Sequence, residues 1–401
     1  SQGFVVNNSA FDNDFINNTL TNNGVGTTTL AVNQSAGITL RATTRRTRIE
    51  RNIVYANYGA GIAVNNDIAT DSIITQNSFY DNGTIVARDS SPATGQIGID
   101  LNSAAEDANL GTFPFYTLNA ETVGGNGLYD FPVFTSAEIV GTNLELKGTS
   151  ITGTIIEFFI ADSDPSGYGE GETWLFTDSE GSGSDLDADA GEFFFQVPVP
   201  GGVSAGTELT ATATLGAGAT SEFALNETVV LTSEITGTIF VDEAGDGLTD
   251  GPIGVAPNLW EAGARIELYR AGPDGNPDGV DDTYIGFTTS SAFDGTYSFS
   301  GLSADIYYVT VDSQGVDDGP YNGTYSGLDT WAEQTYGPIG AASFDGVSTW
   351  TFAPTAGAFY GGAQRDVSDD HSPANSLPGA EHIARVDATG GDVTDVDFGF
   401  S

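Results

Sequence analysis

The sequence from residue 51 reads Arg51-Asn52-Ile53-Val54-Tyr55-Ala56-Asn57 and then Gly61-Ile62-Ala63-Val64, and the pattern returns as Gln76-Asn77-Ser78-Phe79-Tyr80-Asp81-Asn82 and Gly98-Ile99-Asp100-Leu101. Each copy has an Asn, four residues, a second Asn, and then a short apolar strand that opens with Gly. A looser copy has Asn18, Asn23 and Gly37-Ile38-Thr39-Leu40. A segment repeated at intervals of about 25 residues is typical of a solenoid, so the sequence predicts at least three stacked coils.

The paired Asn residues predict a right-handed parallel β-helix for residues 1–115. Coils of such a helix stack about 4.8 Å apart, so equivalent Asn side chains in successive coils can pass hydrogen bonds from one amide to the next. Its strands alternate between the interior and solvent, which places Ile62 and Val64 inside and Ala63 outside. Asn-rich runs also form surface loops, but the regular recurrence favours the coils.

Composition predicts an all-β protein of two to four domains. The 401 residues suffice for sizeable cores, helical periodicity is nearly absent, and many short Val, Ile, Phe and Thr runs are broken by Gly, Asn and Asp. There is no Cys, and no apolar run is long enough to span a bilayer. Because the sequence begins at Ser1 and contains no Met, we expect a processed or excerpted piece of a longer secreted chain.

The formal net charge of −44 excludes nucleic acid as a partner and disfavours membrane insertion or binding to anionic lipid. The charge is uneven, because residues 1–88 carry six acidic groups and six Arg. An acidic surface repels itself in dilute buffer and is stabilised by salt or divalent cations. We therefore expect an extracellular or cell-surface location, in a saline or calcium-containing medium.

The N-terminal segment contains five closely spaced arginines, Arg41, Arg45, Arg46, Arg48 and Arg51. They solvate the outer face of a strand, or they receive a carboxylate-rich partner, which includes another copy of this protein. The stretch Phe4-Val5-Val6 has the pattern of a strand from an internal coil of the solenoid, and no capping element precedes it. We expect self-association or repeats of the same unit, with N-terminal coils against the C-terminal module of the next copy.

Residues 116–233 predict a β-sandwich, because strand-like runs alternate with turn residues at 144–148, 154–161, 173–177, 192–199 and 208–214. Further marks of this segment and of the stretch just before it are Gly98-Ile99-Asp100-Leu101, Asn126-Gly127-Leu128 with Phe131-Pro132-Val133, Ile156-Glu157-Phe158-Phe159, Ser166-Gly167-Tyr168-Gly169-Glu170-Gly171 and Thr210-Ala211-Thr212-Ala213-Thr214. In these residues it resembles an immunoglobulin-like module that often follows β-helical segments in large bacterial surface proteins. The resemblance implies architecture and no chemistry.

An acidic hairpin loop of this sandwich contains Asp185, Asp187 and Asp189 and ends in Gly191. Alternate carboxylates can converge on one hard cation, since calcium takes six to eight oxygen ligands in irregular geometry. The spacing departs from the EF-hand loop, and a plain solvated loop is an equal alternative. Asp162 and Asp164 in the neighbouring loop are weaker candidates.

Residues 234–401 contain Gly237-Thr238-Ile239-Phe240-Val241-Asp242, Gly245-Asp246-Gly247, Ala264-Arg265-Ile266-Glu267-Leu268-Tyr269, Gly295-Thr296-Tyr297-Ser298-Phe299-Ser300-Gly301-Leu302, Tyr307-Tyr308-Val309-Thr310-Val311 and Val393-Thr394-Asp395-Val396-Asp397-Phe398-Gly399-Phe400. In the order and spacing of these strands the segment resembles the B-type repeats of serine-aspartate-rich adhesins and related collagen-adhesin B-like modules. The resemblance implies a small prealbumin-like sandwich that binds Ca2+ in its acidic loops.

Carried over by position, the resemblance implies one calcium site at Asp242, Asp246 and Asp250, and a second at Asp274, Asp278, Asp281 and Asp282. Ala244 stands where the family has an Asn, so a backbone carbonyl or water would replace that ligand. Some of these modules contain a Lys-to-Asn isopeptide bond, but the single lysine, Lys147, lies outside the segment. Calcium would therefore matter more for stability here.

An insertion over residues 313–381 precedes the final strand and is rich in aromatic residues: Tyr321, Tyr325, Trp331, Tyr336, Trp350, Phe352, Phe359 and Tyr360. These rings either stack on sugars or pack as a small satellite core, and we favour packing. Glycans and a host or matrix surface are therefore possible partners in addition to a second copy.

Catalytic motifs are absent from the sequence. Polysaccharide lyases and hydrolases built on β-helices place acidic residues with Arg or Lys on adjacent coils, whereas Asp67, Asp71, Asp81 and Asp100 are scattered here. The sequence therefore favours a non-enzymatic, calcium-stabilised structural or adhesive segment, which assembles head-to-tail into a filament or stalk. The alternative is a carbohydrate-binding or polysaccharide-degrading β-helix protein.

Overall fold

The computed structural model describes residues 3–25, 35–65, 69–102, 124–216, 218–242, 263–312, 316, 332–363 and 377–400. The described residues form β-strands joined by turns, with two short 3-10 helices, η2 (Gly125–Leu128) and η4 (Leu377–Gly379). The chain divides into two compact units, Ser1–Val230 and Leu231–Ser401. The all-β prediction is confirmed.

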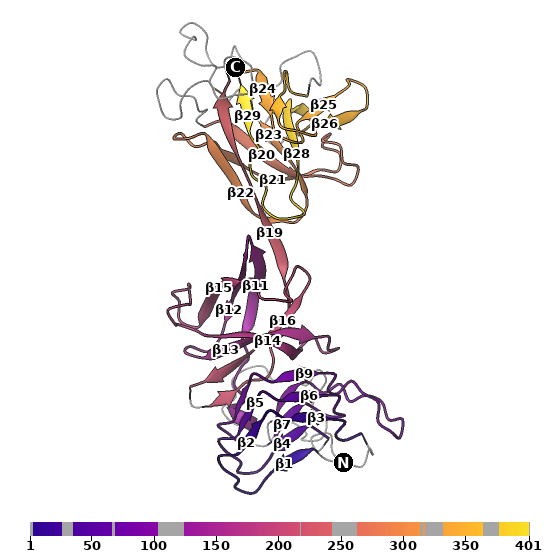
Figure 1. Cartoon of the computed structure of the whole chain (residues 1–401), viewed down its shortest axis with the longest axis vertical. Helices are drawn as coiled ribbons and strands as arrows, with labels where there is room; N and C mark the ends of the chain where they lie inside the picture. The colour runs from indigo at the N-terminus through magenta and orange to yellow at the C-terminus, as the bar shows by residue number, and fades with distance from the viewer. Residues whose placement is uncertain are drawn as a thin grey trace. The chain divides into compact units, whose positions relative to one another are not determined.

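The first unit begins with three parallel sheets that the chain visits in turn, so that every third strand joins the same sheet (Figure 1). The sheets contain β1 (Phe4–Val6), β4 (Ile38–Leu40), β7 (Ile62–Asn65) and β10 (Ile99–Asn102); β2 (Asp14–Ile16), β5 (Arg48–Glu50) and β8 (Ile73–Thr75); and β3 (Thr19–Thr21), β6 (Ile53–Tyr55) and β9 (Ser78–Tyr80). We call residues 3–102 the coil stack.

Two ladders of Asn side chains join successive coils, as the sequence predicted. One contains Asn18, Asn52 and Asn77, and the other Asn23, Asn57 and Asn82. The bonded Nδ2 and Oδ1 atoms lie 2.7–3.0 Å apart. The inner members of both ladders are buried, so these bonds replace the water that the amides would otherwise bind.

The predicted alternation of inward and outward residues is wrong for one sheet. Ala63 was expected to face solvent, but it is buried with Ala36 and Ala60. Strands β4, β7 and β10 are buried at every residue. These three strands are therefore buried on both faces, whereas β1 of the same sheet is largely exposed.

The rest of the first unit is a sandwich of two antiparallel sheets. One sheet has the order β15-β12-β11, with β11 (Val133–Val140), β12 (Asn143–Thr149) and β15 (Glu192–Pro198). The other contains β13 (Ile155–Asp162), β14 (Glu170–Ser179), β16 (Glu208–Leu215), β17 (Ala219–Thr220) and β18 (Glu227–Thr228). The rings of Phe158 on β13 and Phe193 on β15 lie 6.0 Å apart, so the sheets pack through aromatic side chains.

The sandwich closes one end of the coil stack with carboxylates. Backbone N–H groups of the last coil donate to them at 2.8–2.9 Å: Gln76 to Glu157, Asp81 to Asp162, Asn82 to Glu170 and Leu101 to Glu222. Phe159 and Phe223 extend the apolar interior of the stack beyond Phe79. Glu170 thus accepts the bond that the Asn of a further coil would accept, and the end of the ladder is satisfied.

The second unit is built from two further sheets and a hairpin (Figure 1). One sheet contains β19 (Val230–Val241), β22 (Thr296–Ser303), β24 (Gln334–Gly337), β27 (Gly357–Ala358) and β29 (Phe398–Phe400). The other has the order β21-β20-β23-β28, with β20 (Arg265–Arg270), β21 (Thr283–Thr289), β23 (Ile306–Val311) and β28 (His382–Asp387). The main core lies between them and includes Ile239, Leu268, Val309 and Phe398.

A smaller apolar cluster covers the opposite face of the second sheet. Tyr308 and Ile383 project to this face and meet Leu377 of η4. The hairpin of β25 (Ala342–Phe344) and β26 (Trp350–Phe352) packs on the same cluster. The prediction of a satellite core is confirmed for Trp350 and Phe352, whereas Tyr321, Tyr325 and Trp331 lie outside the described residues.

Candidate metal centres

The acidic loop between β14 and β15 is organised by Asp185. Its carboxylate accepts backbone N–H bonds from Gly181, Asp187 and Phe194 at 2.9–3.1 Å. These bonds occupy both oxygens and fix the loop against β15. Asp185 was predicted as a ligand, and the structure places it as the residue that holds the loop in shape.

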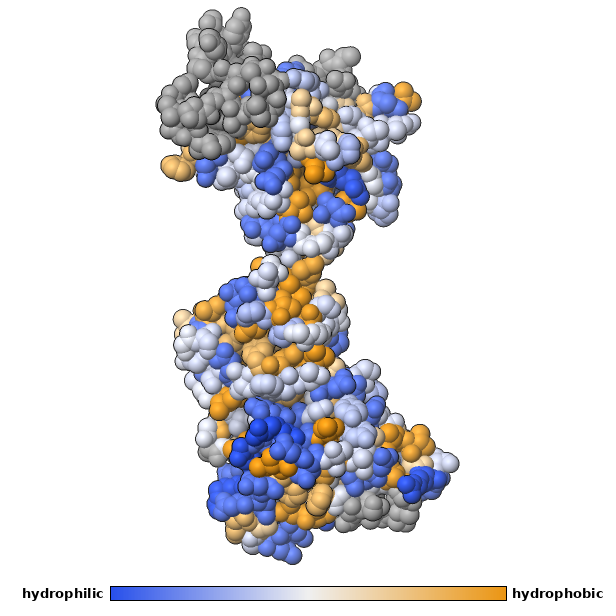
Figure 2. All heavy atoms as spheres, in the orientation of Figure 1, coloured by the Kyte–Doolittle hydropathy of each residue, from blue (hydrophilic) through white to orange (hydrophobic). Residues whose placement is uncertain are grey.

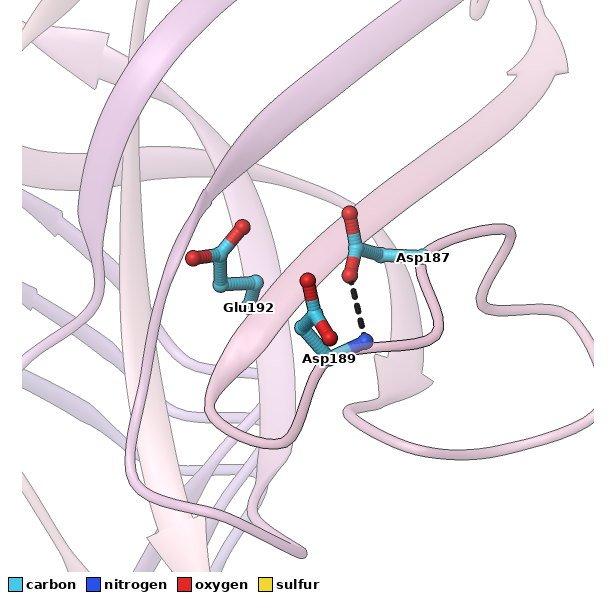
Figure 3. Close-up of side chains that lie close together, drawn as sticks. All are labelled: Asp187, Asp189 and Glu192. Carbon is cyan, nitrogen blue, oxygen red and sulfur yellow. Dashed lines mark hydrogen bonds between the residues drawn. The ribbon is translucent and has the colours of Figure 1, made fainter.

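Three other carboxylates of this loop converge, those of Asp187, Asp189 and Glu192 (Figure 3). One oxygen of each lies within 4.8 Å of the others. Asp187 Oδ1 accepts the N–H of Asp189 at 2.7 Å, which turns the two side chains toward each other. Glu192 opens β15 and was missed by the sequence reasoning, although it follows Gly191 directly and lies three residues beyond Asp189.

The second acidic loop, between β20 and β21, is organised by Asp282. Its two carboxylate oxygens accept the N–H groups of Gly272 and Gly279 at 2.8 and 2.9 Å, which closes the loop on itself. Burial raises the pKa of the Asp282 carboxyl, and repulsion by Asp281 and Asp278 adds to the rise, while the two N–H bonds oppose it. Asp282 therefore has the structural role that Asp185 has in the first loop.

The carboxylates of Asp274, Asp278 and Asp281 converge in the same loop, with one oxygen of each within 4.8 Å of the others. Gly272 permits this approach, because a Cβ at that position would lie 2.0 Å from Asp281 Oδ1. Asp278 and Asp274 also accept backbone N–H bonds within the loop. An all-oxygen set of three carboxylates on an irregular loop fits calcium better than a transition metal.

The hydroxyl of Tyr308 is buried on β23, the strand that pairs with β20. It has no hydrogen-bond partner among the described residues. Burial raises the pKa of the Tyr308 phenol, and the nearby charges of Asp282, Asp274 and Asp281 raise it further. Tyr308 thus experiences the negative charge of the loop, which a bound cation would reduce.

The first site implied by the adhesin resemblance is described only in part. Asp242 is fully buried and its N–H donates to the carbonyl of Phe400 at 2.7 Å. Asp246 and Asp250 lie outside the described residues. This site therefore stays a prediction.

The arginine cluster is largely neutralised within the coil stack. Arg46 pairs with Asp12 at 2.7 Å, and Arg48 and Arg51 both pair with Glu50. Among the described residues, no ion pair involves Arg41 or Arg45. The cluster thus mainly stabilises its own strand, and two of the five cations are left for a partner.

Comparisons with known proteins give no family assignment. No family model and no curated protein matches the chain. Among solved structures, a variant of the shaft pilin SpaA from Lactobacillus rhamnosus GG is similar over 63% of this chain and 86% of the pilin chain, at 10% identity and a TM-score of 0.20. A likeness at this level carries no conclusion.

Within the described residues, no helix has the length and apolar content needed to cross a bilayer. Figure 2 shows hydrophilic and hydrophobic residues interspersed over the visible surface of the described chain. Tyr360 of the aromatic insertion is 59% exposed, unlike the packed rings of β26.

Proposed function

We propose that the chain is a segment of an extracellular structural or adhesive protein that calcium stabilises. In this proposal the coil stack is a parallel β-helix, the sandwich that follows is immunoglobulin-like, and the second unit is a B-type adhesin-like module. The uniform winding of three parallel sheets and the Asn ladders support the first assignment. No catalytic role is proposed.

The observation that carries the proposal is the convergence of Asp274, Asp278 and Asp281 in one loop. Three like charges so close together repel each other in the absence of a cation. A cation that binds only the folded loop stabilises the second unit by RT ln(1 + [L]/Kd), about 2.7 kcal/mol at a hundredfold excess over Kd.

The test is thermal unfolding of the full chain with 1 mM calcium or with EDTA. We expect calcium to raise the midpoint of the second unit. Asp278→Asn should abolish that rise, while the control Glu234→Gln on β19 should retain it. An equal midpoint in calcium and EDTA for the unaltered chain would remove calcium from the proposal.

Self-assembly is the second part of the proposal. The coils bearing Arg41 and Arg45 would contact the acidic second unit of another copy, and a contact between two different surfaces propagates as a filament unless it closes a ring. Sedimentation of the full chain across concentration tests this. Assembly should weaken with salt and in Arg41→Glu with Arg45→Glu; a monomer at every concentration argues against it.

Saccharide binding is a second candidate function, favoured by one feature of the second unit. A groove of about 550 Å³ is lined by hydroxyl groups and two carboxylates, including Thr236, Thr238, Thr296, Ser298, Asp395 and Asp397. Such groups suit the hydroxyls of a sugar. A glycan array probed with the full chain and with Asp397→Asn tests this function, and binding that the substitution leaves unchanged would place the sugar elsewhere.

A further inference from the structure

The groove of the second unit lies on the outer face of the sheet that contains β19 and β22. Ile235 of β19 is buried in the main core, so Thr236 and Thr238, at odd spacings from it, face away from the core. Their cross-strand partners on β22 are Ser298 and Thr296. All four line the groove, so hydroxyl groups form its floor.

Residues 393–397 run along the edge of β19 that lies opposite to β22 and make one side of the groove acidic. Val396 is buried in the main core, whereas its neighbours Asp395 and Asp397 line the groove. The N–H of Thr238 donates to Asp397 Oδ1 at 2.7 Å, which fixes this carboxylate beside the hydroxyl floor. The groove therefore presents hydroxyls and carboxylates next to each other.

The negative charge of the groove is not compensated within the described part of the chain. The described residues that line it include no Lys, Arg or His, and no ion pair among the described residues includes Asp395 or Asp397. Burial raises the pKa of Asp397 and repulsion by Asp395 adds to the rise, whereas the N–H of Thr238 lowers it. The groove thus favours a positively charged ligand.

The groove offers no aromatic surface for the apolar face of a neutral sugar. Tyr297 is the one aromatic residue among its described lining residues, but this side chain is 4% exposed. The Tyr297 hydroxyl donates to the carbonyl of Val396, and its ring packs in the main core with Phe299. Recognition in the groove therefore depends on hydrogen bonds and charge.

We propose that this groove binds an unacetylated amino sugar, whose hydroxyls meet the floor and whose ammonium group meets Asp395 and Asp397. The volume of about 550 Å³ is within the usual range of small-molecule sites, about 300–1,000 Å³. This inference rests on saccharide binding as the second candidate function and names the class of sugar.

A lysine-rich peptide would satisfy the charge but not the shape of the groove. In this region β19 is hydrogen-bonded along both edges, to β22 and to residues 393–397. The floor therefore presents side-chain hydroxyls instead of the free backbone edge that an extended peptide joins. Hydroxyls beside carboxylates match a ligand that has both hydroxyl and ammonium groups.

Titration calorimetry of the full chain at pH 6 in EDTA tests the proposal with a β-1,4-linked glucosamine tetrasaccharide and its N-acetylated counterpart. The amino form should bind at least tenfold more tightly, because acetylation removes its charge. Asp397→Asn keeps the Oδ1 acceptor for Thr238 and should weaken binding of the amino form at least tenfold. EDTA separates the result from calcium binding at the acidic loops.

Two further variants make the test specific to the groove. Asp395→Asn should also weaken binding at least tenfold, and it should fold, because Asn tolerates the left-handed backbone at this position, where φ is 62°. The control Asp278→Asn makes the same charge change in the second acidic loop. It should alter the affinity less than twofold.

The outcomes separate this inference from saccharide binding in general. Equal affinity for the two tetrasaccharides, lost in Asp397→Asn, would overturn the amino sugar but leave saccharide binding in place. Failure of both tetrasaccharides and of cellotetraose to bind would overturn both. Tetralysine that binds as tightly as the amino form, and no longer binds Asp397→Asn, would show that the groove recognises charge alone. Binding of the amino form that neither Asp395→Asn nor Asp397→Asn weakens would also overturn the site.

Discussion

Asn57 connects three coils with one side chain. Its Oδ1 accepts the backbone and side-chain N–H groups of Asn23 at 3.1 and 2.8 Å. Its Nδ2 donates to the Leu20 carbonyl at 3.2 Å and to Asn82 Oδ1 at 2.7 Å. The residue is completely buried, so no water can replace these bonds when the amide is removed.

We predict that Asn57→Ala lowers the free energy of unfolding of the first unit by about 3 kcal/mol, because several buried polar groups lose their partners at once. Urea unfolding measures the change. Thr19→Ala on the exposed face of β3 is the control and should change the value by less than about 0.5 kcal/mol. A similar loss in both variants would contradict the role of the ladder.

Gly272 gives a prediction for the second acidic loop. A Cβ there would lie 2.0 Å from Asp281 Oδ1, so Gly272→Ala must displace that carboxylate. We expect calcium affinity of the loop to fall at least tenfold, measured by titration calorimetry. Gly286→Ala on β21 is the control, since its Cβ would meet no atom within 4 Å; equal affinity in both variants would contradict the assignment.

The sequence identified the acidic loops but did not show which of their carboxylates bind the backbone of the loop. Alternate Asp residues were all treated as possible ligands, yet Asp185 and Asp282 bind backbone N–H groups and shape the loops. The chain reverses direction in a turn at Gly191, and this turn brings the Glu192 carboxylate close to those of Asp187 and Asp189. Spacing along the chain shows which carboxylates are near each other, but it does not show which of them face the backbone.

At the scale of a strand, β28 contains a buried histidine. His382 Nδ1 lies 3.1 Å from Gln334 Oε1 and its ring packs edge-on against Phe400. Burial lowers the pKa of His382 to about 3, so the folded strand holds the neutral ring. The unfolded chain binds a proton below its ordinary pKa of about 6.5.

We therefore predict that His382 makes the second unit less stable as the pH falls from 6.5 toward 3, by about 1.4 kcal/mol per pH unit. The partly buried carboxyls Asp282 and Asp397 act in the opposite direction, because their raised pKa values favour the folded state at low pH. The difference in unfolding free energy between the unaltered chain and His382→Gln isolates the histidine. A difference that does not change with pH would contradict the prediction.

The hairpin β25–β26 gives a prediction about the aromatic insertion. Trp350 packs on the satellite cluster, and Phe352 stacks on Tyr308 with ring centroids 6.4 Å apart. Trp350→Ala should lower the free energy of unfolding of the second unit by roughly 3 kcal/mol, as for a large residue removed from a packed site. An unchanged stability together with lost glycan binding would instead identify Trp350 as part of a sugar platform.

At the scale of elements, the sequence predicted the repeated coils and most strands of the sandwich. It did not predict the contacts between segments that lie far apart in the chain. The Asn spacing predicted the coil ladders, and the predicted runs at 144–148, 154–161, 173–177, 192–199 and 208–214 correspond to β12 to β16. Strands β11 and β21 were not predicted. The carboxylates that close the stack could not be foreseen, because Glu222 meets Leu101 across 121 residues and no local pattern marks that pairing.

At the scale of the whole molecule, the two units carry similar net charges, −21 for residues 1–230 and −23 for residues 231–401, but the second unit carries its charge on fewer residues. Residues 231–401 contain 27 acidic and four basic residues. The coil stack instead contains nearly all the basic residues of the first unit, and its arginines form local ion pairs. Repulsion among like charges destabilises a compact fold and is screened by salt, whereas screening weakens surface ion pairs.

We predict that added NaCl stabilises the second unit more than the first. Between 10 and 150 mM the Debye length falls from about 30 to 8 Å, so long-range repulsion in the acidic unit is largely screened. Calorimetry in EDTA should show the midpoint of the second unit rising by several degrees, with a smaller rise in the first because its arginine pairs weaken. Equal shifts in the two transitions would show that the uneven charge does not control stability.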